Sequence, residues 1–404
     1  MKKRLILFLI TVVLLFALSF ASAGAVREHF VNNGDALDMA LSGAYAVGGD
    51  GSTSILGTGD VYALTGNGLQ KIDGDEFVGG GGLRYDDGSV ILAADRVCVG
   101  LNYYYNEKRD SSLEEARLEN SIGSGYAFGY FNDKRQFVPF LDEEGEIVGT
   151  GMTTIAMRPL GGTAIGIYVT GTDELLFSVE SSGKDSYLAV CPLTGVGQDS
   201  LTWFNKKRYY GDFGYADLGN GKLTVVNLVD MEHYAMGVCA GEMGTGFPVE
   251  ALKAQAVCAR SYAMYQMTHI STYMTQCGFD VTNEDYSQVY VGYTTSDKIT
   301  SAVLATENQY LTYNGSVCNA VYSAADGGET LNSEDAGWSY IPYLRGVTDP
   351  YESSVWEKGV YGHQVGMSQW GAYAMVKNFN KNYKDVLGFY YTDVGLSYGK
   401  LLDD

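Results

Sequence analysis

The chain has 404 residues, enough for two or three domains or for one large domain with additions, and its 46% hydrophobic residues can form a real core. It carries 48 acidic and 27 basic residues, a formal net charge of −21 at pH 7. Binding to nucleic-acid phosphates needs Lys and Arg, so this balance argues against a nucleic-acid partner, while a neutral sugar polymer stays possible.

The first 23 residues have the pattern of an export signal. Residues 2–4 (KKR) are basic, residues 5–20 are apolar or hydroxyl-bearing, and residues 21–23 (ASA) fit a small-residue cleavage site. We expect residues 1–23 to be a cleaved signal peptide. An uncleaved membrane anchor is the alternative, because the apolar run is close to spanning length. Cleavage would remove three basic residues and no acid, leaving a net charge of −24. The protein is therefore predicted to be exported.

Residues 24–95 form a Gly-rich region to which we assign no function, with turn signals between short, weakly patterned stretches. From residue 90 to residue 230, strand signals are dense and turn residues separate them at short intervals. The expected strands lie within residues 90–105, 153–159, 164–171, 175–181, 186–192, 208–219 and 222–230.

Helical patterns begin after residue 230. Asp230 is a plausible N-cap for a first helix and Gly241 a plausible stop. A second helix is expected after Phe247, with Pro248 in its first turn, where a missing N–H is tolerated. Strands followed by helices predict an α+β fold, a β-rich domain with a helical segment.

The six cysteines are not arranged as a disulfide framework. Export permits disulfides, but no tight C-x-x-C pair occurs and the chain is too large to depend on covalent links. Cys239 and Cys258 fall in helical apolar patterns, where cysteine behaves as a small hydrophobic residue. We therefore favour buried free thiols over disulfides.

Three loop-like stretches carry polar residues that a core does not need. The candidates, in chain order, are Glu242, Lys253, Gln255, Arg260, Gln288, Tyr290, His363, Ser368 and Gln369. Each has a structural alternative. Glu242 would be favourable as an acidic residue near the N-terminus of the helix that starts at Pro248, by roughly 0.3–1 kcal/mol. A lone His such as His363 is more often structural than catalytic.

Several long motifs resemble the stage II sporulation protein D family. They include "EHYAMGVCAGEMGTGFPVEALKAQAVCARSYAMY", "SQVYVGY", "AVYSAADGGETLNSEDAGWSYIPYLRGVTDPYE" and "GHQVGMSQWGAYAMVKNFNKNYKDVLGFYYTDV". The likeness is collinear and covers about residues 95 to 398. It implies a catalytic domain at 96–398, preceded by the Gly-rich region 24–95.

The resemblance implies a peptidoglycan lytic transglycosylase. Such enzymes cleave the bond between N-acetylmuramic acid and N-acetylglucosamine in glycan strands stripped of stem peptides, in sporulation or cell-wall remodelling. The family's catalytic acid corresponds to Glu242. One carboxyl suffices, because the 6-hydroxyl of the muramic acid attacks and no water needs a separate base. We expect burial to raise the pKa of Glu242, with Met243 and Phe247 as candidate walls.

The other candidates then acquire implied roles. Lys253, Gln255 and Arg260 would orient Glu242 or bind sugar oxygens, although Lys253 and Arg260 can equally hold the helix in place. The rest would line the groove: Gln288, Tyr290, His363, Ser368 and Gln369. The implied partners are peptidoglycan glycan strands at the cell wall or the outer face of the membrane, together with other sporulation or wall-hydrolase proteins. The alternative is a non-catalytic wall-binding protein that enhances a peptidoglycan amidase, and a secreted scaffold is a third reading.

Two departures from the family pattern are visible. Zinc-bearing relatives have ligands where this chain has Thr282, Tyr286 and Ser287, and hydroxyl groups are poor zinc ligands. His269 and Cys277 are nearby, but two ligands do not close a site, so we expect no metal and no cofactor. The chain also has only residues 351–361 in place of a β-rich insertion, and Gln364 follows His363 where the usual form is "GHGVG".

Overall fold

A computed structural model describes residues 88–120, 125–180, 187–193 and 201–401, together with six short strands between residues 29 and 71. The predicted signal segment 1–23 and most of the Gly-rich region lie outside the described residues. The six short strands pair locally as β1–β2, β3–β4 and β5–β6. They are β1 (His29–Phe30), β2 (Leu37–Asp38), β3 (Tyr45–Val47), β4 (Thr53–Ile55), β5 (Tyr62–Thr65) and β6 (Gly68–Lys71). Among the described residues, no helix has the length and apolar character to cross a membrane.

The largest sheet has the strand order β13-β12-β18-β21-β22-β8-β23, with β14 also paired to β12. Its strands are β8 (Arg96–Asn102), β12 (Gly125–Phe131), β13 (Phe137–Pro139), β14 (Gly149–Thr150), β18 (Leu188–Leu193), β21 (Asp212–Asp217), β22 (Leu223–Asp230) and β23 (Val281–Thr282). β22 is buried along nearly its whole length, as its run of apolar residues requires. Most pairs are antiparallel, and β23 joins β8 in parallel.

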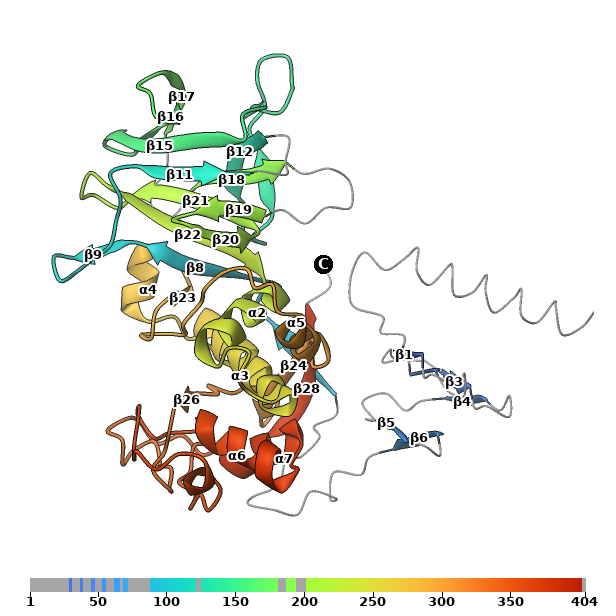
Figure 1. Cartoon of the computed structure of the whole chain (residues 1–404). Coiled ribbons are helices and arrows are strands. Elements are labelled where there is room, and N and C mark those ends of the chain that lie inside the picture. The colour runs from blue at the N-terminus through green and yellow to red at the C-terminus, as the bar shows by residue number, and fades with distance from the viewer. Residues whose placement is uncertain are drawn as a thin grey trace, which may run out of the picture.

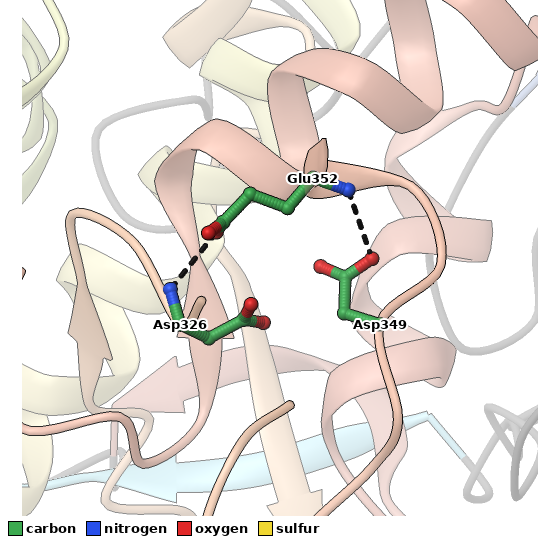
Figure 2. Close-up of side chains that lie close together, drawn as sticks. All are labelled: Asp326, Asp349 and Glu352. Atoms are coloured by element: carbon green, nitrogen blue, oxygen red, sulfur yellow. Dashed lines mark hydrogen bonds between the residues drawn. The ribbon is translucent and has the colours of Figure 1, made fainter. Parts of the chain in front are cut away.

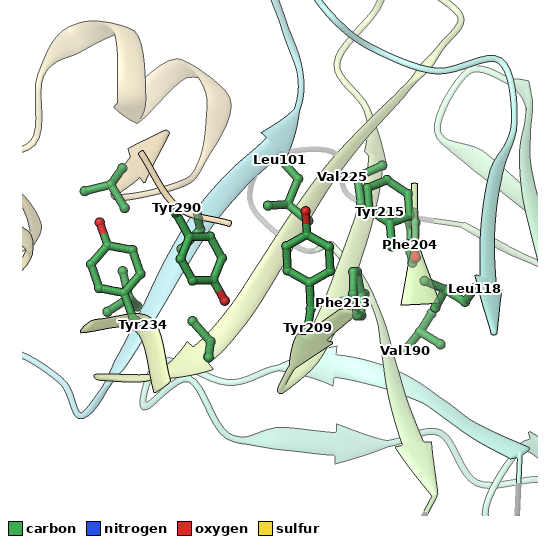
Figure 3. Close-up of a cluster of buried hydrophobic side chains, with 14 of the residues drawn as sticks. Leu101, Leu118, Val190, Phe204, Tyr209, Phe213, Tyr215, Val225, Tyr234 and Tyr290 are labelled. Atoms are coloured by element: carbon green, nitrogen blue, oxygen red, sulfur yellow. The ribbon is translucent and has the colours of Figure 1, made fainter. Parts of the chain in front are cut away.

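A second sheet, of order β17-β16-β15-β11-β19-β20, packs against the first (Figure 1). Its strands are β11 (Ala116–Glu119), β15 (Thr154–Gly161), β16 (Ala164–Val169), β17 (Leu175–Glu180), β19 (Leu201–Phe204) and β20 (Lys207–Tyr210). One hydrophobic core contains side chains from both sheets, among them Leu118 of β11 and Val190 of β18. Figure 3 shows that this core continues through an aromatic row to Tyr234 and Tyr290. The predicted β-rich part of an α+β fold is confirmed.

The helical part follows β22 and surrounds a second core. Its helices are α2 (Met231–Glu242), α3 (Val249–Thr268), α4 (Thr272–Cys277), α5 (Asp297–Leu304), η2 (Glu352–Ser354), α6 (Gln369–Phe379) and α7 (Tyr383–Tyr390). α3 is central, because its small residues, such as Ala251 and Ala254, let neighbouring elements approach closely. Two short strands, β26 (Tyr322–Ser323) and β27 (Met367–Ser368), pair in parallel, and β27 lies against α6 and α7.

A smaller sheet of order β25-β24-β28-β7 completes the fold. Its strands are β7 (Ser89–Leu92), β24 (Gln309–Tyr313), β25 (Ser316–Val317) and β28 (Gly395–Leu401), and a separate hairpin joins β9 (Tyr104–Asn106) and β10 (Arg109–Asp110). β7 pairs in parallel with β28, which joins residues 89–92 to the C-terminal strand. All six cysteines are free thiols, four of them buried, as expected.

Two local expectations need correction. Asp230 is the N-cap of α2 as predicted, accepting hydrogen bonds from Glu232 N–H and His233 N–H, but Gly241 does not end the helix. α2 continues to Glu242, and the chain turns at Gly244, whose φ is +66°. Glu242 therefore ends one helix and does not cap the next, whose N-cap position is Pro248.

Candidate functional site

Glu242 is half-buried at the C-terminal end of α2, where the segment 287–293 crosses the helix. Gly241 permits this crossing, because a Cβ at that position would lie 2.3 Å from the Val289 carbonyl oxygen. The close approach brings the Val289 backbone N–H to Glu242, where it donates to Oε1 at 2.7 Å. One carboxylate oxygen is thus held by the backbone.

The second carboxylate oxygen meets the start of α6. Ser368 is the N-cap of that helix, and Gln369 follows as its first residue. The Gln369 Nε2 donates to Glu242 Oε2 at 3.2 Å and also lies 3.4 Å from Gln255 Oε1. Gln255 is fully buried, and its own Nε2 has no hydrogen-bond partner among the described residues. Two sequence-predicted residues, Gln255 and Gln369, therefore do gather beneath Glu242.

A chain of hydrogen bonds reaches Glu242 from the other side. The Tyr234 hydroxyl donates to Gln288 Oε1 at 2.8 Å, and Gln288 Nε2 donates to the Tyr322 hydroxyl at 2.8 Å. The Tyr322 hydroxyl also lies next to Glu242 and lowers the pKa of its carboxyl by side-chain hydrogen bonding. Gln288 thus acts on the carboxyl through Tyr322.

These surroundings act in opposite directions on the pKa of Glu242. Burial raises it most, because the charged form loses hydration. The hydrogen bonds from Val289 N–H, Gln369 and Tyr322 lower it, and the nearby charge of Asp285 adds a smaller increase. The pKa of Glu242 is raised on balance, in the expected direction, so this residue keeps its proton to a higher pH than an ordinary Glu. When the proton leaves, the carboxylate still has hydrogen-bond donors of the protein around it.

Apolar and aromatic side chains from the segments that follow Glu242 and Gln369 pack together in the second core. Met243 and Phe247, the expected walls, are both buried in the second core. The Phe247 ring lies 5.2 Å from the Trp370 ring and 5.5 Å from that of Tyr373. Trp370 is the residue after Gln369, so α6 supplies both a polar contact and an aromatic neighbour to this region.

Three predicted residues have partners elsewhere. Arg260 is fully buried and forms an ion pair with Glu232, with further bonds to Thr306 and the Val303 carbonyl. Its guanidinium is therefore not available to a glycan, and its role is to hold α3 against its neighbours. Lys253 pairs with Glu250 at 2.6 Å on its own helix. The Tyr290 hydroxyl donates to Asn227 at 2.9 Å inside the first core.

His363 and Ser368 lie close to the site without touching Glu242 in any described contact. His363 Nδ1 accepts from Val365 N–H at 3.1 Å, and the imidazole also hydrogen-bonds the Tyr322 backbone. Burial lowers its pKa, which favours the neutral ring. The buried Ser368 hydroxyl caps α6 and donates to Glu352. Next to His363, Gln364 adopts a φ of +59°, a left-handed conformation that suits the glycine of the usual family form.

The residues at the family's zinc positions, and the nearby His269 and Cys277, lie in separate local environments. Thr282 is buried in β23, where its N–H donates to the Ser287 hydroxyl at 3.0 Å, while its own side-chain hydroxyl has no hydrogen-bond partner among the described residues. Tyr286 is exposed beneath the guanidinium of Arg109. The His269 ring stacks on Tyr265, while Cys277 points at the Tyr104 carbonyl. These side chains do not converge as a set of nitrogen and sulfur ligands.

The arrangement provides one protonatable carboxyl with three donors fixed around it. That is suited to giving a proton to a leaving oxygen and taking one back. Sequence reasoning missed Tyr322 and the Val289 N–H. Tyr322 is the first residue of β26 and lies inside a motif that carried the family likeness, which is the one signal that could have singled it out. The Val289 N–H could not have been predicted, because nearly every residue has a backbone N–H and the sequence does not show which one meets Glu242.

Comparison with known proteins supports the likeness. A family model described as Stage II sporulation protein matches residues 219–313, which include Glu242 but end before Tyr322 and Gln369. The chain is 30% identical to an uncharacterized protein of Brachyspira hyodysenteriae, over 49% of this chain and 74% of that protein. It is 35% identical to the stage II sporulation protein D of Bacillus subtilis, over 31% of this chain and 40% of that protein. It is also 35% identical to the amidase enhancer of Bacillus subtilis, over 30% of this chain and 16% of that protein. The chain belongs to the stage II sporulation protein D family.

Proposed function

We propose that this protein is a peptidoglycan lytic transglycosylase in which Glu242 is the catalytic acid and base. The observation that carries the proposal is the environment of Glu242, a partly exposed carboxyl whose pKa burial raises and whose two oxygens are held by Val289 N–H and Gln369. The substrate class, glycan strands stripped of stem peptides, rests on the family likeness. We also propose that the protein acts outside the cytoplasm, where its substrate lies, after export directed by residues 1–23.

The reaction needs only one carboxyl. Glu242 gives its proton to the glycosidic oxygen as the bond from C1 of muramic acid to that oxygen breaks. The 6-hydroxyl of the same sugar attacks C1 and returns its proton to Glu242, which leaves a 1,6-anhydro end. A tethered hydroxyl replaces a free water, so a high effective concentration substitutes for a second carboxylate.

The neighbours of Glu242 have defined parts in this scheme. Once the proton has left, the new carboxylate is stabilised by the donors from Val289, Gln369 and Tyr322, which need no rearrangement. Gln288 and Gln255 act through Tyr322 and Gln369, and are positioning residues. The net charge also favours stripped strands, because an acidic surface repels the carboxylates of stem peptides.

The test uses purified protein, peptide-free glycan strands and mass analysis of the products in oxygen-18 water. We expect unlabelled 1,6-anhydro ends, and a loss of cleavage of at least ~100-fold in Glu242→Gln, the usual scale for a general acid. Glu250→Gln is the matched control, since Glu250 pairs with Lys253 on α3. Labelled reducing ends would exclude the transglycosylase mechanism, and full activity in folded Glu242→Gln would exclude Glu242.

The second candidate function is enhancement of a peptidoglycan amidase, without cleavage by this chain. The likeness to a protein named amidase enhancer favours it. It predicts that no glycan strand is cut, and that an added amidase is stimulated equally by the wild type and by Glu242→Gln.

A further inference from the structure

Three buried carboxylates converge beside the candidate site. Asp326 follows β26, Asp349 precedes η2, and Glu352 begins η2. Their exposed fractions are only 0%, 3% and 1%, yet one ligand oxygen from each lies within 4.8 Å of the others (Figure 2). Within the described residues this is the single cluster of His, Cys, Asp or Glu side chains with the spacing of an ion site. None of the three takes part in the ion pairs found there, so no Lys or Arg offsets their charge.

Two of the carboxylates are firmly oriented by neutral donors. Glu352 accepts from Asp326 N–H at 2.9 Å, from Gly327 N–H at 2.8 Å and from the Ser368 hydroxyl. Asp349 accepts at one oxygen from Tyr351 N–H at 2.7 Å and at the other from the Tyr390 hydroxyl at 2.6 Å. Ligating carboxylates are themselves commonly hydrogen-bonded in this way, which fixes the direction of their remaining lone pairs.

Asp326 supplies an independent sign that something is bound. Its Oδ1 accepts from Gly328 N–H at 2.8 Å, but its Oδ2 is buried and has no hydrogen-bond partner among the described residues. Figure 2 shows the Asp326 carboxyl group turned toward Asp349. Two carboxylate oxygens that face each other in a buried place need a positive charge between them, either a proton or a cation.

We propose that Asp326, Asp349 and Glu352 bind one hard divalent cation, with calcium as the best match. All three ligands are oxygen atoms, the type that calcium and magnesium prefer, whereas zinc favours nitrogen and sulfur. Calcium bonds of 2.3–2.6 Å place opposite ligands about 4.6–5.2 Å apart, and magnesium bonds place them about 4.0–4.2 Å apart. All separations between these oxygens are within 4.8 Å, inside the range that calcium ligands span, and calcium tolerates irregular ligand geometry where magnesium demands a near-ideal octahedron.

The cation would strengthen the wall of the Glu242 site without taking part in its chemistry. It would join the turn after β26 to the turn before η2, and through Glu352 and Ser368 it would hold the start of α6. The next residue, Gln369, donates to Glu242. This inference revises the expectation that the chain takes no metal, and it does not depend on the proposed glycan cleavage.

The test starts with the full chain stripped of metal by a chelator and titrated with calcium at constant ionic strength. We expect calcium to raise Tm by roughly 3–8 °C at a hundredfold excess over Kd, with saturation at one site. Terbium serves as a luminescent probe, because the Tyr390 hydroxyl touches Asp349 and can sensitise it. Calcium should displace the terbium signal.

Asp326→Asn is the decisive variant, since it removes a charge and one ligand while keeping the shape of the side chain. We expect it to abolish the calcium response, whereas Asp133→Asn, at an exposed turn, should respond like the wild type. Absence of any Tm rise with calcium, magnesium or manganese at ~10 mM would overturn the proposal, as would an equal rise in Asp326→Asn. If Asp326→Asn does not fold, the wild-type titration and the terbium displacement decide alone.

A shared proton is the competing account, and pH separates it. Burial and the charge of Asp349 raise the pKa of Asp326 to about 8. A raised carboxyl pKa makes the folded state bind the proton more tightly, so the metal-free protein should lose stability as pH rises from about 4 to 8. With a cation site, calcium restores that stability at pH 8 and has less effect at pH 5, where protons compete. Failure of every cation to restore it would leave the proton as the occupant.

Discussion

Tyr322→Phe should move the pH dependence of glycan cleavage to higher pH. The change deletes the hydroxyl that donates to Glu242 and leaves the ring in place. A hydrogen bond to a charged group contributes about 1.5–3 kcal/mol, and one pKa unit corresponds to about 1.4 kcal/mol. Loss of this donor destabilises the carboxylate form, so the pKa of Glu242 should rise further by about 1–2 units.

The sign for activity follows from the role of Glu242 as an acid. It must carry a proton when the reaction starts, so activity falls as pH rises through its pKa. The alkaline limb of kcat/KM, which reports the free enzyme, should therefore shift upward by about 1–2 pH units in Tyr322→Phe. The maximal rate should fall as well, because the carboxylate formed during the reaction loses a donor.

Tyr290→Phe is the matched control. It removes a hydroxyl from a buried Tyr whose partner is Asn227 and which makes no described contact with Glu242. Tyr290→Phe should lower the free energy of unfolding and leave the alkaline limb of the kcat/KM profile at its wild-type pH. An unchanged or downward-shifted limb in folded Tyr322→Phe would refute the arrangement described for Glu242, as would an equal shift in both variants.

Three further changes test the packing around the site. Arg260→Met leaves Glu232 without its buried partner and should lower the free energy of unfolding by about 3–5 kcal/mol in urea denaturation; a near-neutral result would contradict the structural role of Arg260. Gly241→Ala puts a Cβ against the Val289 carbonyl and should cost about 1–3 kcal/mol in the same assay, with reduced cleavage because the Val289 N–H is displaced. Asp230→Ala removes the N-cap of α2 and should lower the free energy of unfolding by about 1 kcal/mol, measured as a fall in Tm. Asp230→Asn keeps a capping oxygen and should retain most of the wild-type stability.

The sequence alone determined the local features. Alternating and continuous apolar runs indicated most of the long strands up to residue 230, but the expected ranges left out β10, β11, β12, β13, β14 and β19. Asp230 marked the start of α2, because a cap depends on residues close together in the chain. The family motifs singled out Glu242 and Gln369. Burial of Glu242 was also expected, and the direction of its pKa agrees.

Only the tertiary structure decided which polar residues meet. Val289 and Gln369 reach Glu242 from 47 and 127 residues away, while Arg260, on the neighbouring helix, turns to Glu232 instead. The convergence of Asp326 with Asp349 and Glu352 could not be predicted from the sequence either, because each one, taken alone, is an ordinary acidic residue in a turn. Sequence spacing fixes which residues share a face of one helix or strand. Contacts between elements depend on how those faces pack, here on a glycine that lets the 287–293 segment cross the end of α2.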